Sequence, residues 1–550
     1  MGYFSAVIDS TSMKYNVLTF FVIAIYFSGN CQQKKPISPF VLIVQPIVVQ
    51  SDEGDNPASM ALPENLVDGS YEKAGVDFRF LEPIFYNSTE ARDGLINLDQ
   101  IVKNAQNEGL LRGQDDIVNM FFVNAVDGKT GPLGRGMMGG NLTFIALGEN
   151  KEMNSEELKY MQAFVIAHEV GHNLSLKHVV DDENVPNEIP NIQGDGPFKD
   201  RIDSKNSLTD YQIDIVQKSQ LVHPRIDFLE KKQGEIAILD ETFEPYFSQL
   251  QIREISAFVS EEPPTKDIAT AREFAREKFA SAVTDFSSKE KKCISFVTEK
   301  VIKILQKNNI SLMADQPWRF IKIEDWLCGG FAHTRGTYII LSQRHIDHLS
   351  KEWSDSMTKE DEEKLVVKLG GLLVHEQMHS LQRTFKSRFS KLYTEHWNFK
   401  HANIADNREV RIDQVSNPDA PIAEWLIPDP EKNDSYYWLR TLLKKGSGVP
   451  VMGKDFVDKV FSIEKVNKQY SIKKDEMENL VNTTIEGIPF YKNSFPISRG
   501  FDHPNEISAY MFSEYFQALA TKSNPFKDAT PEASKNTAAF VEWVNNSMRE

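Results

Sequence analysis

The chain has 550 residues, of which 41% are hydrophobic, and its formal net charge at pH 7 is -17. This length exceeds one ordinary domain and suffices for two hydrophobic cores. The excess of acidic residues argues against a nucleic-acid-binding surface, because binding to phosphates requires clustered Lys and Arg. We therefore expect two globular domains and no nucleic-acid partner.

The chain begins with a pattern typical of a targeting segment, residues 1–31. Lys14 precedes the apolar run 17–27, which is too short to cross a bilayer and therefore indicates a secretory signal. The sequence Ser28-Gly29-Asn30-Cys31 resembles the end of a bacterial lipoprotein signal, although Ser28 stands where such signals carry an aliphatic residue. We expect a bacterial protein that is secreted, periplasmic or a cell-surface lipoprotein. Lipidation of Cys31 and ordinary secretion stay open, and a lipid anchor is the only membrane contact we expect.

Four apolar runs in the first half predict strands. They cover residues 39–50, 78–85, 116–126 and 142–147. The last run follows Gly139-Gly140-Asn141, and a glycine-rich turn before a strand suits an edge strand that pairs with an extended substrate. An internal strand with a glycine bulge is the alternative.

Residues 164–178 read FVIAHEVGHNLSLKH and form the central motif of the first half. Positions four apart share a helix face, so His168 and His172 can hold one zinc ion from adjacent turns. His178 cannot lie on the same stripe, so the chain must turn sharply after His172 to return it as third ligand. Three protein ligands leave a fourth position for water, and Glu169 is the expected general base.

This motif resembles HExxHxxGxxH, the pattern of the metzincin zinc endopeptidases, over roughly residues 38–230. Two departures stand out: Ser175 occupies the glycine position, and no methionine lies between Met161 and Met313 to form the Met-turn of that family. The nearest equivalent is the segment 191–194. Tyr211, in a helix expected to start near Thr209, either packs or donates to a developing oxyanion, as a tyrosine does in some metzincins.

The second half begins after a poorly patterned stretch, residues 230–268, where we expect the domain junction. Residues 268–305 indicate helix. A glycine-rich segment, 328–336, then leads into an apolar run at 337–341, so the order of turn, strand and zinc helix repeats that of the first half. His333 and Arg335 in this segment either contact substrate or stabilise the turn.

A second HExxH motif lies in the predicted helix 363–385, with His375, Glu376 and His379 behind an apolar run. Gly370 and Gly371 destabilise this helix and suggest that another backbone packs closely against it. No histidine follows His379 by six residues, so the third ligand must come from elsewhere. The motif resembles the gluzincins, in which a glutamate on a downstream helix completes a His, His, Glu site.

Two glutamates compete for that third position. Glu409, in a segment with Asp413 four residues later, is similar to the gluzincin pattern ExxxD, whereas Glu506 fits NExxA of the aminopeptidase-like gluzincins. We prefer Glu506, because Pro504 suits a first helical turn and Ala509 permits close approach to the zinc helix. Glu409 remains the alternative.

These observations predict an α+β fold with two zincin-like domains, each a mixed sheet packed on a buried zinc-binding helix, the second more helical. The expected boundaries are 38–255 for the metzincin-like domain and 265–550 for the gluzincin-like domain. Cys293 and Cys328 could pair or remain buried thiols.

The resemblances imply a zinc-dependent metalloendopeptidase that hydrolyses peptide or protein substrates, with two zinc ions per chain and Glu169 and Glu376 as general bases. One alternative is a single active domain beside a degenerate one. The other is a surface lipoprotein binding module whose zinc sites are structural.

Overall fold

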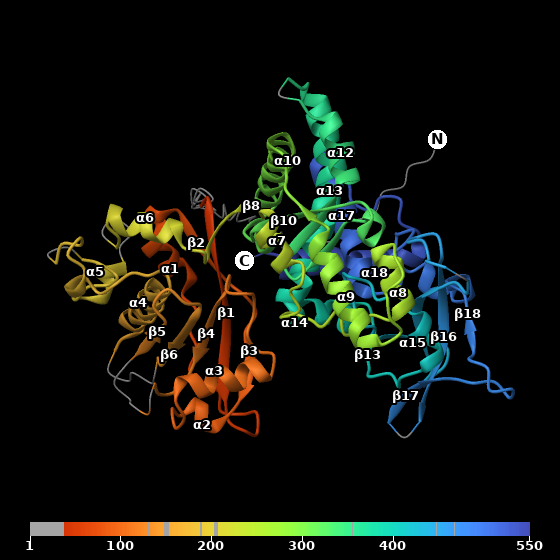
Figure 1. Cartoon of the computed structure of the whole chain (residues 1–550), viewed down its shortest axis with the longest axis horizontal. Helices are drawn as coiled ribbons and strands as arrows, with labels where there is room; N and C mark the ends of the chain where they lie inside the picture. The colour runs from red at the N-terminus through yellow and green to blue at the C-terminus, as the bar shows by residue number, and fades with distance from the viewer. Residues whose placement is uncertain are drawn as a thin grey trace, which may run out of the picture. The chain divides into compact units, whose positions relative to one another are not determined.

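The computed structural model describes residues 38–126, 128, 133–147, 153–187, 190–202, 207–354, 356–446, 448–466 and 468–549 (Figure 1). Residues 38–550 belong to one compact unit. The expected signal segment, including Cys31, lies outside the described residues. Among the helices of the described residues, none combines the length and the apolar character needed to cross a bilayer. Cys293 and Cys328 are both buried and unpaired.

The first sheet is built around β1 (Phe40–Gln50), an apolar run that is buried from Val41 to Val49. Such a run suits a strand covered on both faces. All strand pairs of this sheet are parallel except two. The strand β5 is antiparallel to β6, and β7 is antiparallel to β1. The strands are β2 (Val76–Phe80), β3 (Ile84–Asn87), β4 (Val118–Phe122), β5 (Gly134–Gly136), β6 (Leu142–Ile145) and β7 (Val222–Pro224), with the main order β2-β1-β4-β6-β5.

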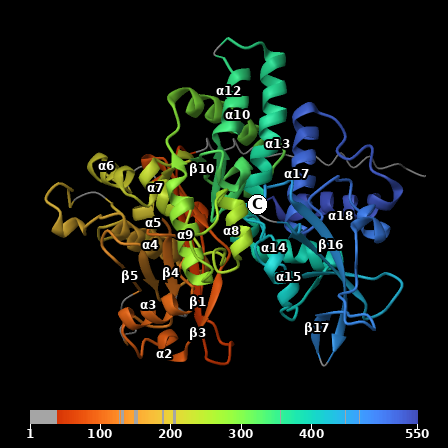
Figure 2. The same cartoon turned by 45° about the vertical axis from the view of Figure 1, so that its right-hand side comes forward.

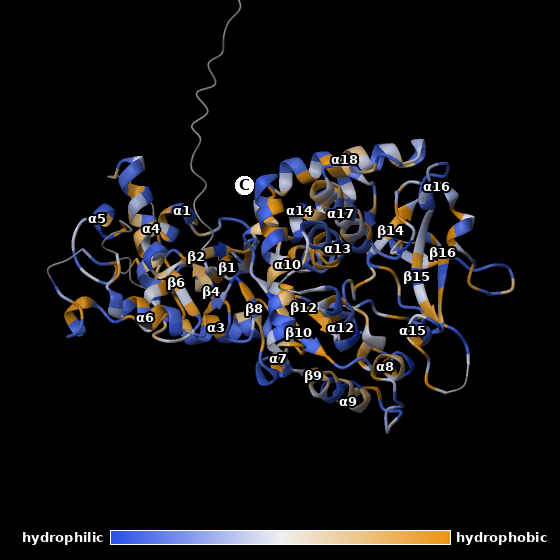
Figure 3. Ribbon diagram, turned by 90° about the horizontal axis from the view of Figure 1, so that it is seen from above, coloured by the Kyte–Doolittle hydropathy of each residue, from blue (hydrophilic) through white to orange (hydrophobic). Residues whose placement is uncertain are grey.

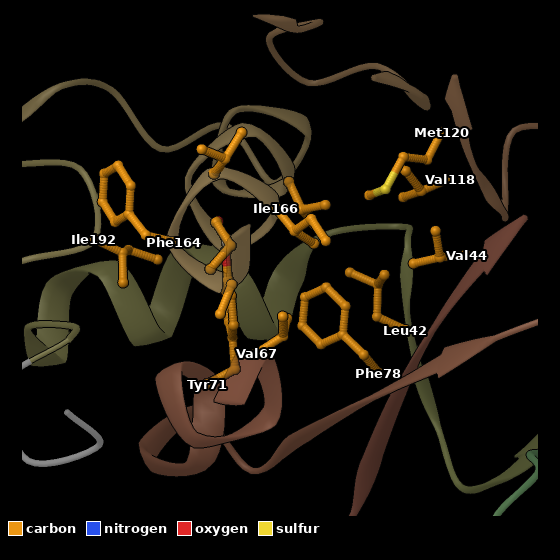
Figure 4. Close-up of a cluster of buried hydrophobic side chains, with 14 of the residues drawn as sticks. Leu42, Val44, Val67, Tyr71, Phe78, Val118, Met120, Phe164, Ile166 and Ile192 are labelled. Carbon is orange, nitrogen blue, oxygen red and sulfur yellow. Dashed lines mark hydrogen bonds between the residues drawn. The ribbon is translucent and has the colours of Figure 1, made fainter. Parts of the chain in front are cut away.

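Helices cover both faces of this sheet. Side chains of α1 (Glu64–Tyr71) and α4 (Ser155–Asn173) pack on one face, and those of α3 (Leu98–Asn107) on the other. Figure 4 shows the first of these cores, in which Ile166 of α4 points toward strand residues such as Met120, whereas Phe164 lies beside Ile192. The Tyr71 hydroxyl also donates to the Ala167 carbonyl at 2.7 Å. The apolar half of α4 is therefore fixed on the sheet. The remaining elements here are α2 (Thr89–Arg92), α5 (Phe198–Ile202), α6 (Asp210–Lys218) and the 3-10 turns Glu72–Ala74 and Val179–Asp181.

The strand predictions for the first half need two corrections. Residues 78–85, expected as one strand, form the end of β2 and the start of β3, because the chain leaves β1 after Phe80 and rejoins it at Ile84. The strand after the glycine-rich turn, β6, is internal, since it pairs with β4 and β5. The edge strand is β5, which precedes that turn. The turn at Gly139 therefore connects two neighbouring antiparallel strands.

The second sheet has the order β11-β12-β10-β8, with β9 also paired to β10. Its edge strand β11 is antiparallel to β12, as β5 is to β6 in the first sheet. The strands are β8 (Ile226–Phe228), β9 (Val283–Thr284), β10 (Trp318–Ile323), β11 (His333–Arg335) and β12 (Tyr338–Ser342).

Two long helices of the second half, α13 (Lys359–Thr384) and α17 (Pro504–Thr521), run side by side (Figures 1 and 2). Cβ atoms added at Gly370 and Gly371 would lie 2.7 Å from Phe516 and 2.6 Å from Gln517. The two glycines thus allow α17 to approach α13 closely, through its side chains. Figure 3 shows α10 and α14 beside this pair. The other helices are α7 (Lys231–Ala237), α8 (Ile252–Val259), α9 (Ile268–Ser281), α10 (Ser288–Lys307), α11 (Ser311–Ala314), α12 (Gln343–Glu352), α14 (Lys386–Lys391), α15 (Arg408–Asp413), α16 (Pro489–Lys492) and α18 (Pro531–Ser547), with 3-10 or π turns at Leu327–Gly330, Leu392–His396 and Ile485–Gly487.

A third sheet, antiparallel throughout its strand pairs, is not among the sequence-based predictions. Buried residues such as Leu426 and Phe461 form its core. Its two longest strands mix buried positions with partly buried ones, and in β16 also with exposed ones, without strict alternation, so periodicity does not identify them. The strands are β13 (Lys400–His401), β14 (Trp425–Pro428), β15 (Tyr436–Leu443), β16 (Phe456–Val466), β17 (Gln469–Ile472) and β18 (Asn482–Thr483).

The chain passes from the first sheet to the second earlier than the predicted domain boundary. The strand β8 follows β7 after one residue but pairs with β10 of the second sheet. Side chains of α7 and α8 also belong to the core of the second sheet. Residues 226–259 therefore pack with the second sheet, whereas the sequence assigns residues up to 255 to the first domain. Burial of their apolar side chains, which local patterning does not reveal, decides this placement.

Candidate metal centres

The first centre is built on α4, whose start is fixed by a capping box between Asn154 and Glu157. The last turns of this helix carry His168 and His172 four residues apart, so both lie on one face of the helix. Their Nδ1 atoms lie 2.7 Å from the Ile192 carbonyl and 2.8 Å from the Leu176 carbonyl. A carbonyl can only accept, so both Nδ1 atoms carry the proton and both Nε2 lone pairs are free for a metal.

A tight turn brings His178 back to these two rings. Ser175 adopts a left-handed conformation with φ of +69°, and the helix ends just before it. The Nε2 atom of His178 lies 3.2 Å from Nε2 of His172 and 3.3 Å from Nε2 of His168. The structure thus brings together the three histidines that the spacing singled out.

These distances fit a zinc ion. Three nitrogens bound tetrahedrally at 2.0–2.1 Å from zinc lie about 3.3 Å from one another. Three acceptor lone pairs that meet without a cation would repel, and burial together with the neighbouring rings lowers the pKa of His168 to about 4, which keeps that ring neutral. The donor set therefore suits a divalent cation better than protons.

The carboxylate of Glu169 lies beside this triad. Its Oε2 atom accepts a hydrogen bond from the Gly136 backbone amide of β5 at 2.5 Å. Burial raises the pKa of Glu169 to about 7, and the Gly136 hydrogen bond partly opposes that rise. Near neutral pH such a carboxylate can both accept and release a proton.

The segment 191–194, named from sequence as the nearest equivalent of a Met-turn, contacts the helix that carries the triad. Besides the Ile192 carbonyl, the Gln193 side chain donates to the His168 carbonyl at 2.7 Å. Ile192 itself is fully buried. Tyr211 is exposed at the start of α6, and no hydrogen bond within the described residues joins it to the triad.

The second centre combines α13 and α17. The Nε2 atoms of His375 and His379 are 3.2 Å apart, and the carboxylate of Glu506 lies 3.5 Å from the first and 3.8 Å from the second. Glu409 is exposed on α15 and belongs to no such group among the described residues. Of the two competing glutamates, the fold brings Glu506 to the histidines.

Further polar contacts orient this second ligand set. The Gln382 side chain accepts from Nδ1 of His379 at 2.8 Å and donates to the Asn505 carbonyl, while Asn417 donates to Glu506 at 2.7 Å. Burial alone would raise the pKa of Glu506, but the two histidines and Asn417 hold it at about 2. Glu506 is thus an anion facing two ring nitrogens, a donor set that fits zinc.

Glu376 is held by residues that sequence reasoning missed. The Thr334 hydroxyl on β11 donates to Glu376 at 3.0 Å, and the Thr334 amide donates to Asp419 at 2.6 Å. Ligand atoms of Glu376, His379 and Asp419 all lie within 4.8 Å of one another. Burial raises the pKa of the carboxyl groups of Glu376 and Asp419. No sequence spacing identifies Asp419.

His333 and Arg335, the other candidates on β11, are buried. The Arg335 guanidinium lies 4.0 Å from the centre of the Tyr246 ring and donates to the Asp240 carbonyl. The His333 ring contacts the Phe331 carbonyl. Both side chains therefore pack within the protein around the edge strand. This agrees with the alternative that the two residues stabilise this segment and do not contact substrate.

The two centres differ in access. The side chain of His178 is 49% exposed, whereas that of His379 is fully buried. A substrate can therefore approach the first triad directly, while the second lies deeper.

No protein-family model and no curated protein sequence matches the chain. Among solved structures, the chain is similar to the crystal structure of archaemetzincin from Methanopyrus kandleri. The match is 10% identical, covers 32% of this chain and 94% of that one, and has a TM-score of 0.24. A likeness of this size carries no functional conclusion, so the function has to be argued from the two centres.

Proposed function

We propose that the protein is a zinc metallopeptidase with two centres that each hydrolyse peptide bonds. The observation that supports this most directly is the first centre, where three histidine Nε2 atoms meet beside a buried carboxylate and the lone pairs of His168 and His172 are free of a proton. Zinc bound there supplies Lewis acidity to a water molecule and to a peptide carbonyl. Glu169 and Glu376 would take a proton from the attacking water and pass it to the leaving amine.

The edge strands support an extended substrate. The strands β5 and β11 each end a sheet on the side of a candidate centre, and Gly136 and Thr334 connect them to Glu169 and Glu376. An unpaired strand edge can add one more strand through main-chain hydrogen bonds. A peptide paired in this way with β5 would pass the general base of the first centre, whereas β11 is buried and its Thr334 amide already donates to Asp419.

The proposed location is outside the cytoplasm of a bacterial cell. This part of the proposal rests on the sequence alone, namely the apolar run 17–27 and the lipoprotein-like residues that end at Cys31. Mass spectrometry of the protein recovered from a bacterial host tests it. A mature chain that starts at a diacylated Cys31 supports the lipoprotein, one cleaved without lipid supports secretion, and an uncleaved chain contradicts both.

A specific observation favours one alternative, in which the second centre is a structural zinc site. Asp419 lies next to Glu376 and His379 and could help to close the second centre, as four protein ligands do in structural zinc sites. In that case only the first centre would be active. A binding module in which both sites are structural is the more distant alternative, because a half-exposed His178 leaves the first site open.

Cleavage of a diverse peptide library tests the function. The full-length protein is compared with Glu169→Gln, Glu376→Gln and the double variant, which should keep zinc and lose the base. If each single variant loses a different set of cleavages, both centres are peptidases. If Glu376→Gln cleaves as the unmodified protein does, only the first centre works. No chelator-sensitive cleavage by any of them would contradict the proposed activity.

Zinc content tests the ligand assignment separately from activity. We expect about two zinc ions per chain, falling to about one in Glu506→Gln, because a neutral amide is a poor zinc ligand. Glu409→Gln is the matched control and should keep the full content. A loss in Glu409→Gln, with none in Glu506→Gln, would reverse the assignment.

A further inference from the structure

Three side chains in contact, His375, Tyr510 and Arg499, lead from the second centre to the surface. The ring of Tyr510 on α17 lies 4.5 Å from the ring of His375, measured between centroids. The guanidinium carbon of Arg499 lies 5.0 Å from the centroid of the same Tyr510 ring, on an exposed side chain. Arg499 therefore stands within two ring contacts of the candidate metal ligands.

The backbone next to Arg499 is fixed against the helix that carries Glu506. Gly500 has φ of +77°, and a Cβ atom added there would lie 2.4 Å from the Tyr510 ring and 3.2 Å from Cβ of Glu506. Only glycine allows the chain to lie this close in this conformation. The loop thus holds Arg499 at the rim of the second centre.

The acidic groups of this centre already have partners, and Arg499 does not. Glu506 faces the two histidines and Asn417, Asp419 accepts from the Thr334 amide, and Glu376 accepts from the Thr334 hydroxyl. Within the described residues Arg499 forms no ion pair, and its guanidinium lies over the face of the Tyr510 ring. A guanidinium that lies over a ring face and forms no ion pair keeps N–H groups for a further ligand.

We propose that Arg499 binds a carboxylate group of the peptide substrate at the second centre, an inference that rests on the peptidase function proposed above. The planar guanidinium presents paired N–H donors that match a carboxylate in bidentate geometry. An extended peptide advances about 3.3–3.6 Å per residue, so this carboxylate belongs to a residue within about three positions of the cleaved bond. It is either the terminal carboxylate or an acidic side chain.

The experiment uses the full-length protein in a Glu169→Gln background, so that cleavage reports the second centre. Two sets of matched peptides are compared. One set differs only in a free or amidated C-terminus, and the other carries Glu or Gln near the cleaved bond in amidated peptides. We expect Arg499→Gln to lower kcat/KM by roughly 10–100-fold for the carboxylate peptides only, mainly through KM. Arg499→Lys should restore part of this loss, because it keeps the charge without the bidentate fork.

The controls separate binding from folding and from the proposed activity. Arg408→Gln removes an exposed arginine on α15 and should leave both peptide sets unaffected. The peptide set that responds identifies the source of the carboxylate. Equal losses for all peptides, or none, would overturn the inference while the peptidase function stands. Absence of chelator-sensitive cleavage in the Glu169→Gln background would overturn the function of the second centre and this inference with it.

Discussion

The return of His178 to the first triad depends on the conformation of one residue. Ser175 adopts a left-handed conformation at the position where the pattern HExxHxxGxxH has glycine. Its amide donates to the His172 carbonyl, and the Leu176 amide donates to the Gly171 carbonyl, both at 2.9 Å. These bonds hold the turn although a residue with a Cβ atom pays about 1–2 kcal/mol for this conformation. A serine at this position is therefore compatible with the turn and costs stability.

Ser175→Gly should stabilise the protein by roughly 0.5–1 kcal/mol, because relief of the left-handed strain exceeds the extra chain entropy of glycine. The free energy of unfolding, followed by thermal or urea denaturation, checks this. Ser534→Gly, inside α18, is the matched control and should destabilise by roughly 0.5 kcal/mol. If both substitutions destabilise equally, strain at Ser175 is not the cause.

At the scale of elements, α4 and β5 approach each other where the edge strand has glycines at alternate positions. A Cβ atom added at Gly136 would lie 2.0 Å from the Glu169 carbonyl oxygen, and one at Gly134 would lie 2.6 Å from Cγ of Glu169. The strand therefore lies directly on the helix. This contact is what allows the Gly136 amide to reach the Glu169 carboxylate.

Gly136→Ala should force the strand away from the helix, cost roughly 1–3 kcal/mol of stability and lower cleavage at the first centre. Unfolding and peptide cleavage in a Glu376→Gln background measure the two effects. Gly69→Ala is the control, because no atom lies within 4 Å of the added Cβ in α1. It should be neutral or stabilising by up to about 1 kcal/mol. Unchanged activity in Gly136→Ala would show that the strand position does not matter for Glu169.

At the scale of the whole molecule, buried polar side chains join the first two sheets. Arg225, between β7 and β8, donates to the carbonyls of Ser38 and Asp315 and to the carboxylate of Asp77. Nearby, Asp116 accepts from Arg319 at 2.6 Å and from the Tyr338 hydroxyl at 2.7 Å. Asp116, just before β4, thus forms a polar network with Arg319 and Tyr338 of the second sheet, and the stability of that network depends on its protonation.

His223 titrates within this network. Its Nε2 atom donates to the Asp116 carbonyl at 2.9 Å, and burial together with Arg319 lowers its pKa to about 4. The unfolded chain takes up a proton near pH 6.5, whereas the folded protein does so only near pH 4. The stability that a neutral His223 contributes at pH 7 is therefore lost as the pH falls between these two values, by up to about 3 kcal/mol.

His223→Gln keeps an N–H donor without a titrating ring, so its unfolding free energy should fall less steeply between pH 6.5 and 4 than that of the unmodified protein. Denaturation at a series of pH values gives both curves. His348→Gln, at an exposed histidine, should leave the slope unchanged. Parallel curves for His223→Gln and the unmodified protein would contradict the argument.

Local sequence patterns predict the helices that carry the candidate ligands, and also α6. Apolar periodicity, the capping residue Thr209 and Pro504 in the first turn of α17 indicated helices where the structure has them. The HExxH spacing alone puts two histidines on one face, since that depends only on the helical repeat. The need to return His178 predicts a sharp turn after His172, and the left-handed conformation of Ser175 provides it.

Tertiary packing decided everything that joins distant parts of the chain. The preference for Glu506 over Glu409 used local helix signals, but only the contact of α17 with α13 brings its carboxylate to His375 and His379. Thr334, Asp419 and the edge position of β5 carry no local signal, because strand order and loop placement depend on which apolar faces bury each other. Side-chain periodicity is a property of neighbours in sequence, whereas a metal centre built from two helices and a loop is a property of neighbours in space.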